Sequence, residues 1–379
     1  MTHIIYHEFS LEEYDLRYRK AKILMKRIGA DGLLVTDERN VRYFSGFTPR
    51  TKNRPVLFFL PLKGDPILLV SKELGVEDAK RISFVQRIDS YDLPLSHEAI
   101  LATIKEAGLA SSVIGIEWDD TVFGGFRPSI QYGVFEKLRQ SLPKATFINS
   151  SELLWELRMV KTRAEVDCIR KACEITTKAL DFAFQSIKSE MTERDVAQFL
   201  VTAMMKEGAD YPSLGRPGPC GFILMDASRP LHNPHYPTEK KLKMGDLVHI
   251  DLGAVYKGYH TDFTRSAVLG PPTKRQKQIW KTLKERVQRS ISRIKSGMKL
   301  GEIKVHWHGV GLDYVEAPFG GLLNRGIHRG LLARPGMVLC VEDLVFSKAG
   351  ETFAFEEVVY IKKKGIEILS TANSDLRVI

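Results

Sequence analysis

Two periods of apolar and polar residues alternate through the first 150 residues. Apolar residues at helical spacing from 16 to 28, closed by Gly29, predict a helix. Short β-prone runs predict strands at 32–36, 56–60, 66–70, 113–117 and 146–149, with another helix near 133–142. The polar stretch 37–40 is interpreted as a turn, and 63–65 as the turn of a hairpin. We therefore expect an α/β domain over residues 1–150.

The pattern changes from residue 151 onward. Ser151 is a candidate helix cap, and Thr162 with Glu165 forms a capping-box pattern ahead of a helix that runs toward Phe184. Further helices are expected at 192–206 and 276–294. Strongly alternating strands are expected at 247–255, 259–268, 337–341 and 353–361. Helices combined with antiparallel strands predict an α+β domain over residues 151–379.

Composition and charge narrow the classes of protein. Lys and Arg total 56 and Asp and Glu 46, but the excess is scattered, which favours a solvated surface over a nucleic-acid site. No apolar run reaches the ~20 residues that span a bilayer, and the first residues lack the pattern of a signal peptide. The four cysteines show no CxxC spacing, so we expect reduced thiols in a cytoplasmic protein.

Asp251 and Asp262 lie in apolar strand-like runs joined by a turn at 257–258, although Asp is unfavourable in strands. In a hairpin with an even loop the two positions have the same parity, so both carboxylates project from one face. Two anions there would repel unless a cation lies between them. Clustered carboxylates are what a pair of divalent metal ions needs. For either Asp alone, a turn or an exposed strand position is the simpler interpretation.

The acidic pattern continues downstream. Glu342 ends an otherwise apolar run, and a buried carboxylate is usually protonated, paired or bound to a metal. Glu356 and Glu357 lie within another apolar strand. His306 and His308 precede a glycine-rich bend. Periodicity does not choose between the two histidines or between the two adjacent glutamates.

These motifs together resemble the "pita-bread" metallohydrolases, the superfamily of aminopeptidase P, Xaa-Pro dipeptidase, methionine aminopeptidase and creatinase (peptidase family M24). The segment 251–265 (DLGAVYKGYHTDFTR) resembles its metal-binding hairpin. Its later motifs resemble 308–312 (HGVGL), 335–338 (PGMV) with Glu342, and 355–359 (FEEVV). Residues 32–36 and 40–47 resemble the creatinase-type N-terminal domain. The resemblance implies a creatinase-type domain at 1–150 and a pita-bread catalytic domain with a curved, mainly antiparallel sheet at 151–379.

The resemblance also implies a ligand set and a mechanism. The family's five metal ligands match Asp251, Asp262, His308, Glu342 and Glu356, with Asp262 and Glu356 bridging two divalent ions. Mn, Co, Zn and Fe all suit such a site. A hydroxide between the ions would attack an amide or peptide bond, with Glu342 as proton shuttle. Xaa-Pro dipeptides or aminopeptidase P substrates are the default expectation.

Three further residues are nominated by the resemblance. His232, within LHNP at 231–234, matches the histidine that contacts substrate and the developing oxyanion, and His235 is the rival assignment. Arg54, in the loop 47–54, is a candidate partner for a substrate carboxylate. Creatinase-type relatives are dimers whose N-terminal domains gate the substrate site, so a homodimer is expected.

Two features depart from the family pattern. Val315 stands where peptidase members carry a second histidine, and losing an oxyanion donor can cost ~10²–10³ in rate. The segment 266–307 is short, with little room for the helix and strand that members have there. These departures leave two alternatives open. The first is an enzyme for a small solute, like creatinase, ectoine hydrolase or dimethylsulfoniopropionate lyase. The second is a catalytically impaired binding protein.

Overall fold

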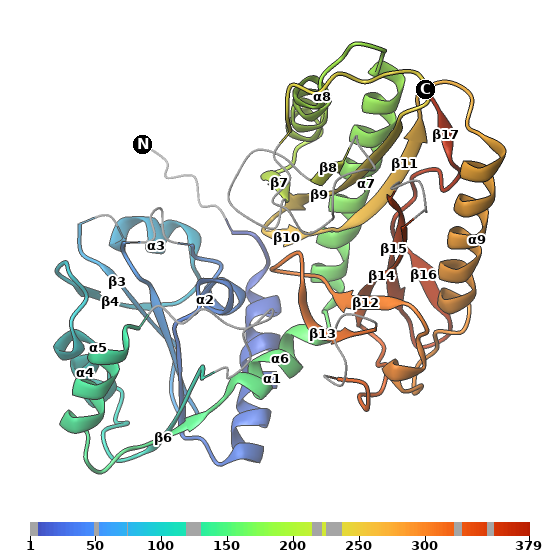
Figure 1. Ribbon diagram of the computed structural model, residues 1–379. Helices are drawn as coiled ribbons and strands as arrows, with labels where there is room; N and C mark the ends of the chain where they lie inside the picture. Colours follow the sequence, from blue (N-terminus) through green and yellow to red (C-terminus); the bar gives the residue numbers. More distant parts are fainter. Residues whose placement is uncertain are drawn as a thin grey trace. The chain divides into compact units, whose positions relative to one another are not determined.

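The structure is a computed structural model that describes residues 7–48, 53–73, 75–118, 130–213, 222–224, 237–321, 328–346 and 352–379. The chain divides into two compact units, Met1–Arg158 and Met159–Ile379 (Figure 1). The division falls at the end of helix α6 (Ser151–Met159). This helix is tied to the first unit, because Arg158 donates to Asn40 Oδ1 (3.0 Å) and Glu156 pairs with Arg27 (2.6 Å).

The first unit is built on a six-stranded mixed sheet with the order β4-β3-β2-β1-β5-β6. The pairs β3–β4, β1–β5 and β5–β6 are parallel, and β1–β2 and β2–β3 are antiparallel. In chain order its other elements are α1 (Leu11–Ile28), β1 (Gly32–Val35), α2 (Glu38–Ser45), β2 (Leu57–Pro61), β3 (Ile67–Ser71), α3 (Val76–Ile82), β4 (Arg87–Tyr91), α4 (His97–Glu106), β5 (Val113–Ile116), α5 (Tyr132–Ser141) and β6 (Thr146–Asn149).

The central strands of this sheet are buried on both faces. Phe58 of β2 stacks on Phe44 of α2 (ring centroids 5.1 Å apart) and on Tyr18 of α1 (6.0 Å). Its neighbour Phe59 points the other way, into a cluster that includes Ile100 of α4. Helices on both faces explain why these strands are continuous apolar runs in the sequence. The expected α/β domain and the hairpin β2–β3 are confirmed.

The interpretation of 37–40 as a turn is wrong, because these residues begin helix α2. Asp37 is the N-cap, and its side chain accepts hydrogen bonds from the backbone N–H groups of Arg39 (2.9 Å) and Asn40 (3.4 Å). Polar residues that favour turns also favour helix starts, so the local pattern was ambiguous. The elements α3, β4 and α4 were not predicted. Strand β4 gives a weak apolar signal because most of its residues are only partly buried.

A buried carboxylate at the end of β5 fixes the start of α2. Glu117 is fully buried and accepts hydrogen bonds from Thr36 N (2.6 Å), Thr36 Oγ1 (2.8 Å), Asp37 N (2.9 Å) and Asn40 Nδ2 (2.8 Å). Burial, with the nearby charge of Asp37, raises the pKa of Glu117 from 4.5 to about 7. The folded protein therefore binds a proton here at pH values where the unfolded chain has released it.

We expect this group to make the first unit less stable as the pH rises from 4.5 to 7. Because the pKa of Glu117 is higher in the folded protein than in the unfolded chain, its contribution to the free energy of unfolding is fully present below pH 4.5. That contribution is lost as the pH rises through the folded-state pKa of about 7. Relative to Glu117→Gln, the wild type should lose on the order of 3 kcal/mol across this interval. Urea unfolding of both proteins below pH 4.5 and above pH 7 measures the difference. Glu38→Gln, which removes a partly buried carboxyl from helix α2, is the control, and parallel pH profiles for Glu117→Gln and wild type would contradict the assignment.

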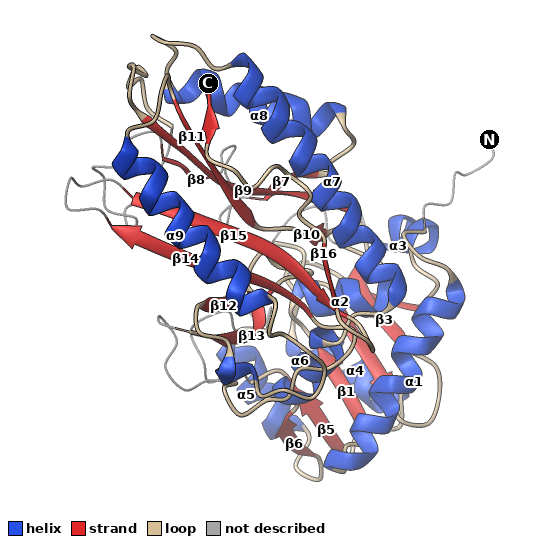
Figure 2. Cartoon of the chain, turned by 90° about the vertical axis from the view of Figure 1, so that its right-hand side faces the viewer, coloured by secondary structure: helices blue, strands red, loops and turns tan. Residues whose placement is uncertain are grey.

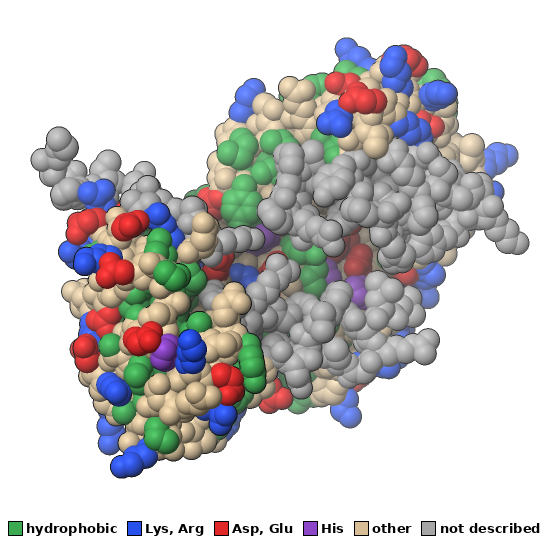
Figure 3. All heavy atoms as spheres, turned by 60° about the vertical axis from the view of Figure 1, so that its left-hand side comes forward, with side chains coloured by type: hydrophobic (Ala, Val, Ile, Leu, Met, Phe, Trp, Pro, Cys, Tyr) green, Lys and Arg blue, Asp and Glu red, His purple; other side chains and the backbone are tan. Residues whose placement is uncertain are grey.

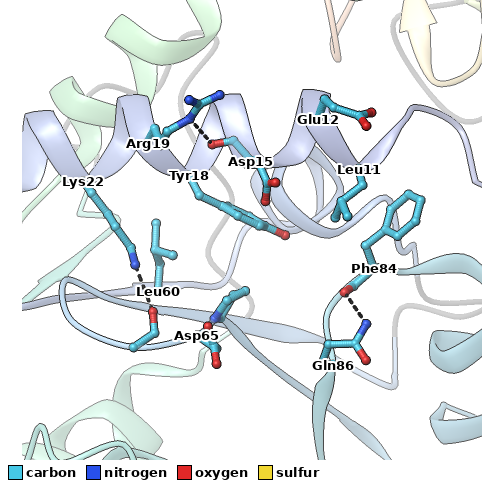
Figure 4. A pocket seen from close by; sticks show the side chains of 12 residues that line it. Leu11, Glu12, Asp15, Tyr18, Arg19, Lys22, Leu60, Asp65, Phe84 and Gln86 are labelled. Atoms are coloured by element: carbon cyan, nitrogen blue, oxygen red, sulfur yellow. Dashed lines mark hydrogen bonds between the residues drawn. The ribbon is translucent and has the colours of Figure 1, made fainter.

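A groove of about 580 Å³ lies between α1 and the β2–β3 turn of the first unit (Figure 4). Lys22 Nζ donates to the carbonyl of Gly64 (2.9 Å), and the Tyr18 hydroxyl donates to the carbonyl of Phe44 (2.7 Å). These two polar groups are therefore already bonded to backbone carbonyls.

The second unit contains two mainly antiparallel sheets, with helices packed against them (Figure 2). One sheet has the order β10-β9-β11-β17, with β7 and β8 also paired to β9, and the other has the order β13-β12-β14-β15-β16. Helix α7 contacts β9, and α9 contacts β14 and β15. The elements are α7 (Arg163–Ser186), α8 (Glu193–Lys206), β7 (Tyr211–Ser213), β8 (Phe222–Leu224), β9 (Leu247–Tyr256), β10 (Tyr259–His260), β11 (Phe263–Val268), α9 (Lys274–Ile291), η1 (Leu300–Glu302), β12 (His306–Gly309), β13 (Glu316–Gly320), β14 (Val338–Phe346), β15 (Thr352–Ile361), β16 (Ile366–Ile368) and β17 (Arg377–Val378).

Most local predictions for this unit are confirmed. The capping box at α7 is present, with Glu165 N bonded to Thr162 Oγ1 (3.3 Å) and Thr162 N bonded to Glu165 Oε2 (2.8 Å). The strand expected at 259–268 is instead split into β10 and β11. A Cβ on Gly253 would lie 1.7 Å from the carbonyl oxygen of Thr261, so the two backbones approach very closely here, although the pairing register is the same on both sides of the interruption. Strand β14 also extends beyond the expected 337–341.

The short connection before β12 is a feature of the structure. Between Ile291 and His306, where every residue is described, the chain forms one 3₁₀ turn, η1, in place of a further helix and strand. Leu300 anchors this turn, because it is fully buried and its N–H donates to the carbonyl of Leu331 (2.8 Å). Across the described residues, no helix is both long enough and apolar enough to cross a bilayer.

Candidate metal centre

The hairpin of β9 and β11 places two carboxylates on one face of the sheet. Asp251 is opposite Thr264 in the register, and the same register puts Asp262 two positions along on the same side. The tight turn holds this register, because Lys257 (φ 49°) and Gly258 (φ 74°) are both left-handed, as a type I′ hairpin requires. The expectation that both side chains share a face is confirmed.

The neighbouring strands of the second sheet bring five more polar side chains to one face. His306 is directly opposite Glu342, and His308 is directly opposite Cys340, in the pairing of β12 with β14. Glu342 is in turn opposite Glu356 in the pairing of β14 with β15. Because directly opposite residues on antiparallel strands project from the same side, all these side chains face the same way.

The two sheets meet where β11 lies beside β15, and the two sets of side chains converge there. The Thr264 hydroxyl donates to Glu356 Oε2 (3.2 Å). His308 Nε2 lies 3.5 Å from Glu356 Oε1 and 3.9 Å from Asp262 Oδ2. Donor atoms of Asp251, Asp262 and Glu356 all lie within 4.8 Å of one another, as do donor atoms of His308, Cys340 and Glu356. Figure 3 shows acidic and histidine side chains together in a hollow of one face.

Burial and mutual repulsion dominate the electrostatics of this cluster. Burial, with the charge of Glu342, raises the pKa of Asp251 to about 7. Burial, with neighbouring carboxylates, raises the pKa values of Asp262 and Glu356 well above their usual range. Burial works in the same direction on Glu342, but the hydrogen bond from His306 and the neighbouring imidazoles outweigh it, so that the pKa of Glu342 is lowered. Glu342 is therefore the carboxylate that stays ionised most readily.

The residues fit a divalent cation. Glu356 Oε1 is a buried oxygen with no hydrogen-bond partner among the described residues, which is costly unless a cation is bound. His308 Nδ1 bonds to the carbonyl of Gly309 (3.0 Å), which leaves the lone pair of Nε2 directed at the carboxylates. Burial lowers the pKa of His308, so the neutral, ligating form is favoured. Clustered carboxylates with one imidazole are a donor set for hard and borderline divalent ions.

The structure separates the two adjacent glutamates that the sequence left open. Glu356 faces the cluster, whereas Glu357 faces the opposite side and pairs with the buried guanidinium of Arg265 (2.8 Å). Glu357 also contacts the hydroxyl of Ser370. The two histidines, by contrast, project from the same face of β12. His308 approaches the carboxylates, and His306 Nδ1 bonds to Glu342 Oε1 (2.6 Å).

The adjacent glutamates give a matched pair of variants. Glu357→Gln leaves Arg265 as a buried charge without its counter-ion, so we expect it to destabilise the protein by about 3–5 kcal/mol while metal affinity is retained. Glu356→Gln should weaken metal binding by at least ~10–100-fold with little loss of metal-free stability, because it relieves like-charge crowding. Calorimetric metal titration and urea unfolding of both variants test this. A Glu357→Gln protein that loses metal while Glu356→Gln keeps it would reverse the assignment.

The remaining residues that the sequence nominated lie outside the cluster or outside the described residues. His232 and His235 lie outside the described residues. Arg54 belongs to the first unit, where its guanidinium lies 3.5 Å from Glu73, and its contact with a substrate carboxylate stays a prediction. Val315 directly precedes β13 and is partly buried. Its neighbour Glu316 is fully buried and pairs with Lys161 (2.6 Å).

Sequence reasoning overlooked two members of the cluster, Cys340 and Thr264, and assigned no partner to His306. A period of two would have found Cys340, because it stands two residues before Glu342 on the same strand. Thr264 stands two residues after Asp262 and faces the same side.

Comparison with known proteins matches both units to families. Residues 17–160 match the creatinase/prolidase N-terminal domain, and residues 167–307 match metallopeptidase family M24. Over its second unit the chain is similar to the M24 metallopeptidases, and it is a metal-dependent hydrolase of the pita-bread fold. The M24 match includes Asp251 and Asp262 and ends just before His308, at the short connection described above.

The relatives are similar over nearly their whole length. The Xaa-Pro dipeptidase of Pyrococcus horikoshii is 26% identical over 378 residues, which covers 95% of this chain and 98% of that protein. The Xaa-Pro dipeptidase of Pyrococcus furiosus is also 26% identical, covering 95% and 99%. The crystal structure of the P. horikoshii prolidase superposes with a TM-score of 0.78 at 25% identity, covering 94% of this chain and 99% of that one.

Proposed function

We propose that the protein is an Xaa-Pro dipeptidase-like enzyme whose second unit binds two divalent metal ions. The observation that carries the proposal is the convergence of Asp251, Asp262, His308, Glu342 and Glu356 from two sheets. The buried Oε1 of Glu356, which has no hydrogen-bond partner in the described part of the chain, supports it independently. Both Pyrococcus relatives are Xaa-Pro dipeptidases, and their similarity supports the substrate class.

In this proposal the five side chains would hold the ions. Bound divalent ions would lower the pKa of a water toward neutrality and polarise the carbonyl of the scissile bond. Mn, Co, Zn and Fe all remain candidates, since each accepts a carboxylate-rich site with one imidazole. The high pKa values of Asp262 and Glu356 imply that ion binding displaces protons from the cluster.

Glu342 is the proposed proton shuttle. It would accept a proton from the attacking water and deliver it to the departing amine. Its lowered pKa favours the ionised, proton-accepting form. His306 holds one oxygen of the carboxylate, Oε1, by a 2.6 Å hydrogen bond, which leaves Oε2 available for the proton. A carboxylate fixed in this way loses less conformational freedom when the reaction begins.

Substrate contacts are proposed from the family pattern. His232, or its rival His235, would contact the substrate and the developing oxyanion, and Arg54 would contact a substrate carboxylate. We also propose a cytoplasmic homodimer. The cytoplasmic location is supported by Cys173 and Cys340, two buried cysteines that form no disulfide within the described part of the chain.

A substrate panel combined with metal analysis tests the proposed function. The purified protein should contain divalent metal and hydrolyse Xaa-Pro dipeptides faster than dipeptides without proline. Compatible solutes and amidino compounds belong in the same panel. Val315, where peptidase members carry a second histidine, specifically favours the small-solute alternative because it removes an imidazole donor. If the protein turns over a solute and hydrolyses no dipeptide, the small-solute enzyme replaces the proposed dipeptidase. If the protein binds no divalent metal, both metalloenzyme functions are ruled out.

A further inference from the structure

Cys340 occupies a position in the cluster that the proposed ligand set does not use. It lies on β14 directly opposite His308 and two residues before Glu342, so its side chain faces the site. It is fully buried, and donor atoms of His308, Cys340 and Glu356 lie within 4.8 Å of one another. The thiol therefore belongs geometrically to the same cluster as the carboxylates.

The spacing is compatible with one ion. Zinc binds thiolate sulfur at about 2.3 Å and imidazole nitrogen at about 2.0–2.1 Å, so donors around one ion lie within roughly 4.5 Å of one another. The second, independent sign of a ligand is Glu356 Oε1, which has no hydrogen-bond partner among the described residues although Glu356 is only 2% exposed. An ion there would be coordinated by this oxygen, by Nε2 of His308 and by the sulfur together.

We propose that Cys340 is a thiolate ligand at the side of the metal centre formed by His308 and Glu356, and that it shifts this site toward softer ions such as Zn²⁺ and Co²⁺ over Mn²⁺. Thiolate is a softer donor than carboxylate, and softer donors select zinc over manganese. This inference rests on the proposed metal centre, and it adds a sulfur donor to a ligand set that otherwise contains only oxygen and nitrogen.

In the metal-free protein a hydrogen bond holds the thiol of Cys340 in place. Cys340 Sγ donates to the backbone carbonyl of Asp262 (3.3 Å). Burial and the surrounding carboxylates raise the pKa of Cys340 well above its usual range, so the thiol is protonated in that state. Forming the sulfur–metal bond breaks the S–H bond, and the proton leaves to solvent. If Cys340 were only structural, the hydrogen bond to Asp262 would persist in the metal-bound protein.

Cobalt spectroscopy of the full-length protein tests the proposal. Metal-free wild type, Cys340→Ser and Cys173→Ser are titrated with Co²⁺ while the absorption spectrum is recorded. Cys173 is the matched control, because it is an equally buried thiol whose recorded partner is the hydroxyl of Thr261 (3.0 Å). We expect a thiolate-to-cobalt charge-transfer band in the near ultraviolet for wild type and Cys173→Ser, and its loss in Cys340→Ser.

The outcomes separate the inference from the function on which it rests. Co²⁺ binding without a charge-transfer band in wild type overturns the role of Cys340 and leaves the metal centre in place. No Co²⁺ binding at all overturns the proposed metal centre and, with it, the inference. If Cys340→Ser does not fold, a variant with serine at 168, 173 and 220 keeps Cys340 as the only thiol. A band that disappears in that variant also overturns the proposal.

Metal competition gives a second readout that does not depend on activity. Zn²⁺ and Mn²⁺ affinities are measured by calorimetry for wild type and Cys340→Ser. We expect the preference for Zn²⁺ over Mn²⁺ to fall by at least about tenfold in the variant, since loss of even an indirect metal contact costs 10–100-fold in affinity. An unchanged preference contradicts the proposal.

Discussion

Removal of divalent metal by a chelator is expected to abolish hydrolysis of Xaa-Pro dipeptides, and added metal should restore it. The physical reason is that neutral water is a poor nucleophile, whereas a divalent ion lowers the pKa of a bound water from about 15.7 to about 7. Among the described residues, the groups of side chains that could hold such an ion are Asp251, Asp262 and Glu356, and His308, Cys340 and Glu356. Initial rates with the protein before dialysis, after chelation and after metal addition measure the effect.

Thermal unfolding supplies the control for this experiment. An ion that binds only the folded state stabilises it by about 2.7 kcal/mol when its concentration is 100 times its dissociation constant. Metal addition should therefore raise the unfolding temperature of the metal-free protein, and this shift should be smaller in Glu356→Gln. Full activity in a preparation verified to be metal-free would refute the proposed centre.

Glu342→Gln is expected to lower kcat for dipeptide hydrolysis by about 10²–10⁴-fold, the usual contribution of a general acid–base group. Gln keeps the size of the side chain but cannot accept a proton from water. The amide can still meet His306, because its oxygen can take the place of Oε1 in that hydrogen bond. Steady-state kinetics together with the metal content of the variant show whether the loss is chemical or results from an empty site.

Asp343→Asn is the matched control for this variant. Asp343 is the next residue on the same strand, and its carboxylate pairs on the other face with Arg286 (2.7 Å), whose side chain is 46% exposed. Its replacement should leave kcat within about twofold and cost about 1–3 kcal/mol of stability, because the Asp343 side chain is only 8% exposed and loses charge-assisted hydrogen bonds. Equal losses of kcat in both variants would argue that the strand is perturbed generally and that Glu342 has no special role.

The pairing of Asp251 with Asp262 was predictable because it depends on local rules. The period of two along a strand and the two-residue turn at Lys257 and Gly258 fix which face each side chain takes. The capping box at Thr162 was predictable for the same reason, since its two hydrogen bonds join residues three apart.

Glu356 and Glu357 show where local rules end. Strand β15 is buried on both faces, so its apolar pattern does not say which face meets the site. One carboxylate reaches the metal centre and the other reaches Arg265, and both environments are compatible with the same alternation. Asp37–Asn40 is a similar case, because polar residues that satisfy a turn also satisfy the first turn of a helix.

The amino-acid sequence by itself determined the approximate positions of strands β9, β11, β14 and β15 in the second unit, the shared face of Asp251 and Asp262, and the order of the acidic motifs. Only the tertiary structure decided that β11 lies beside β15, so that Thr264 reaches Glu356 and His308 reaches both Glu356 and Asp262. It also brought Cys340 into the cluster. Periodicity reports which way a side chain faces on its own strand, whereas the distance between strands far apart in the chain depends on how the two sheets pack.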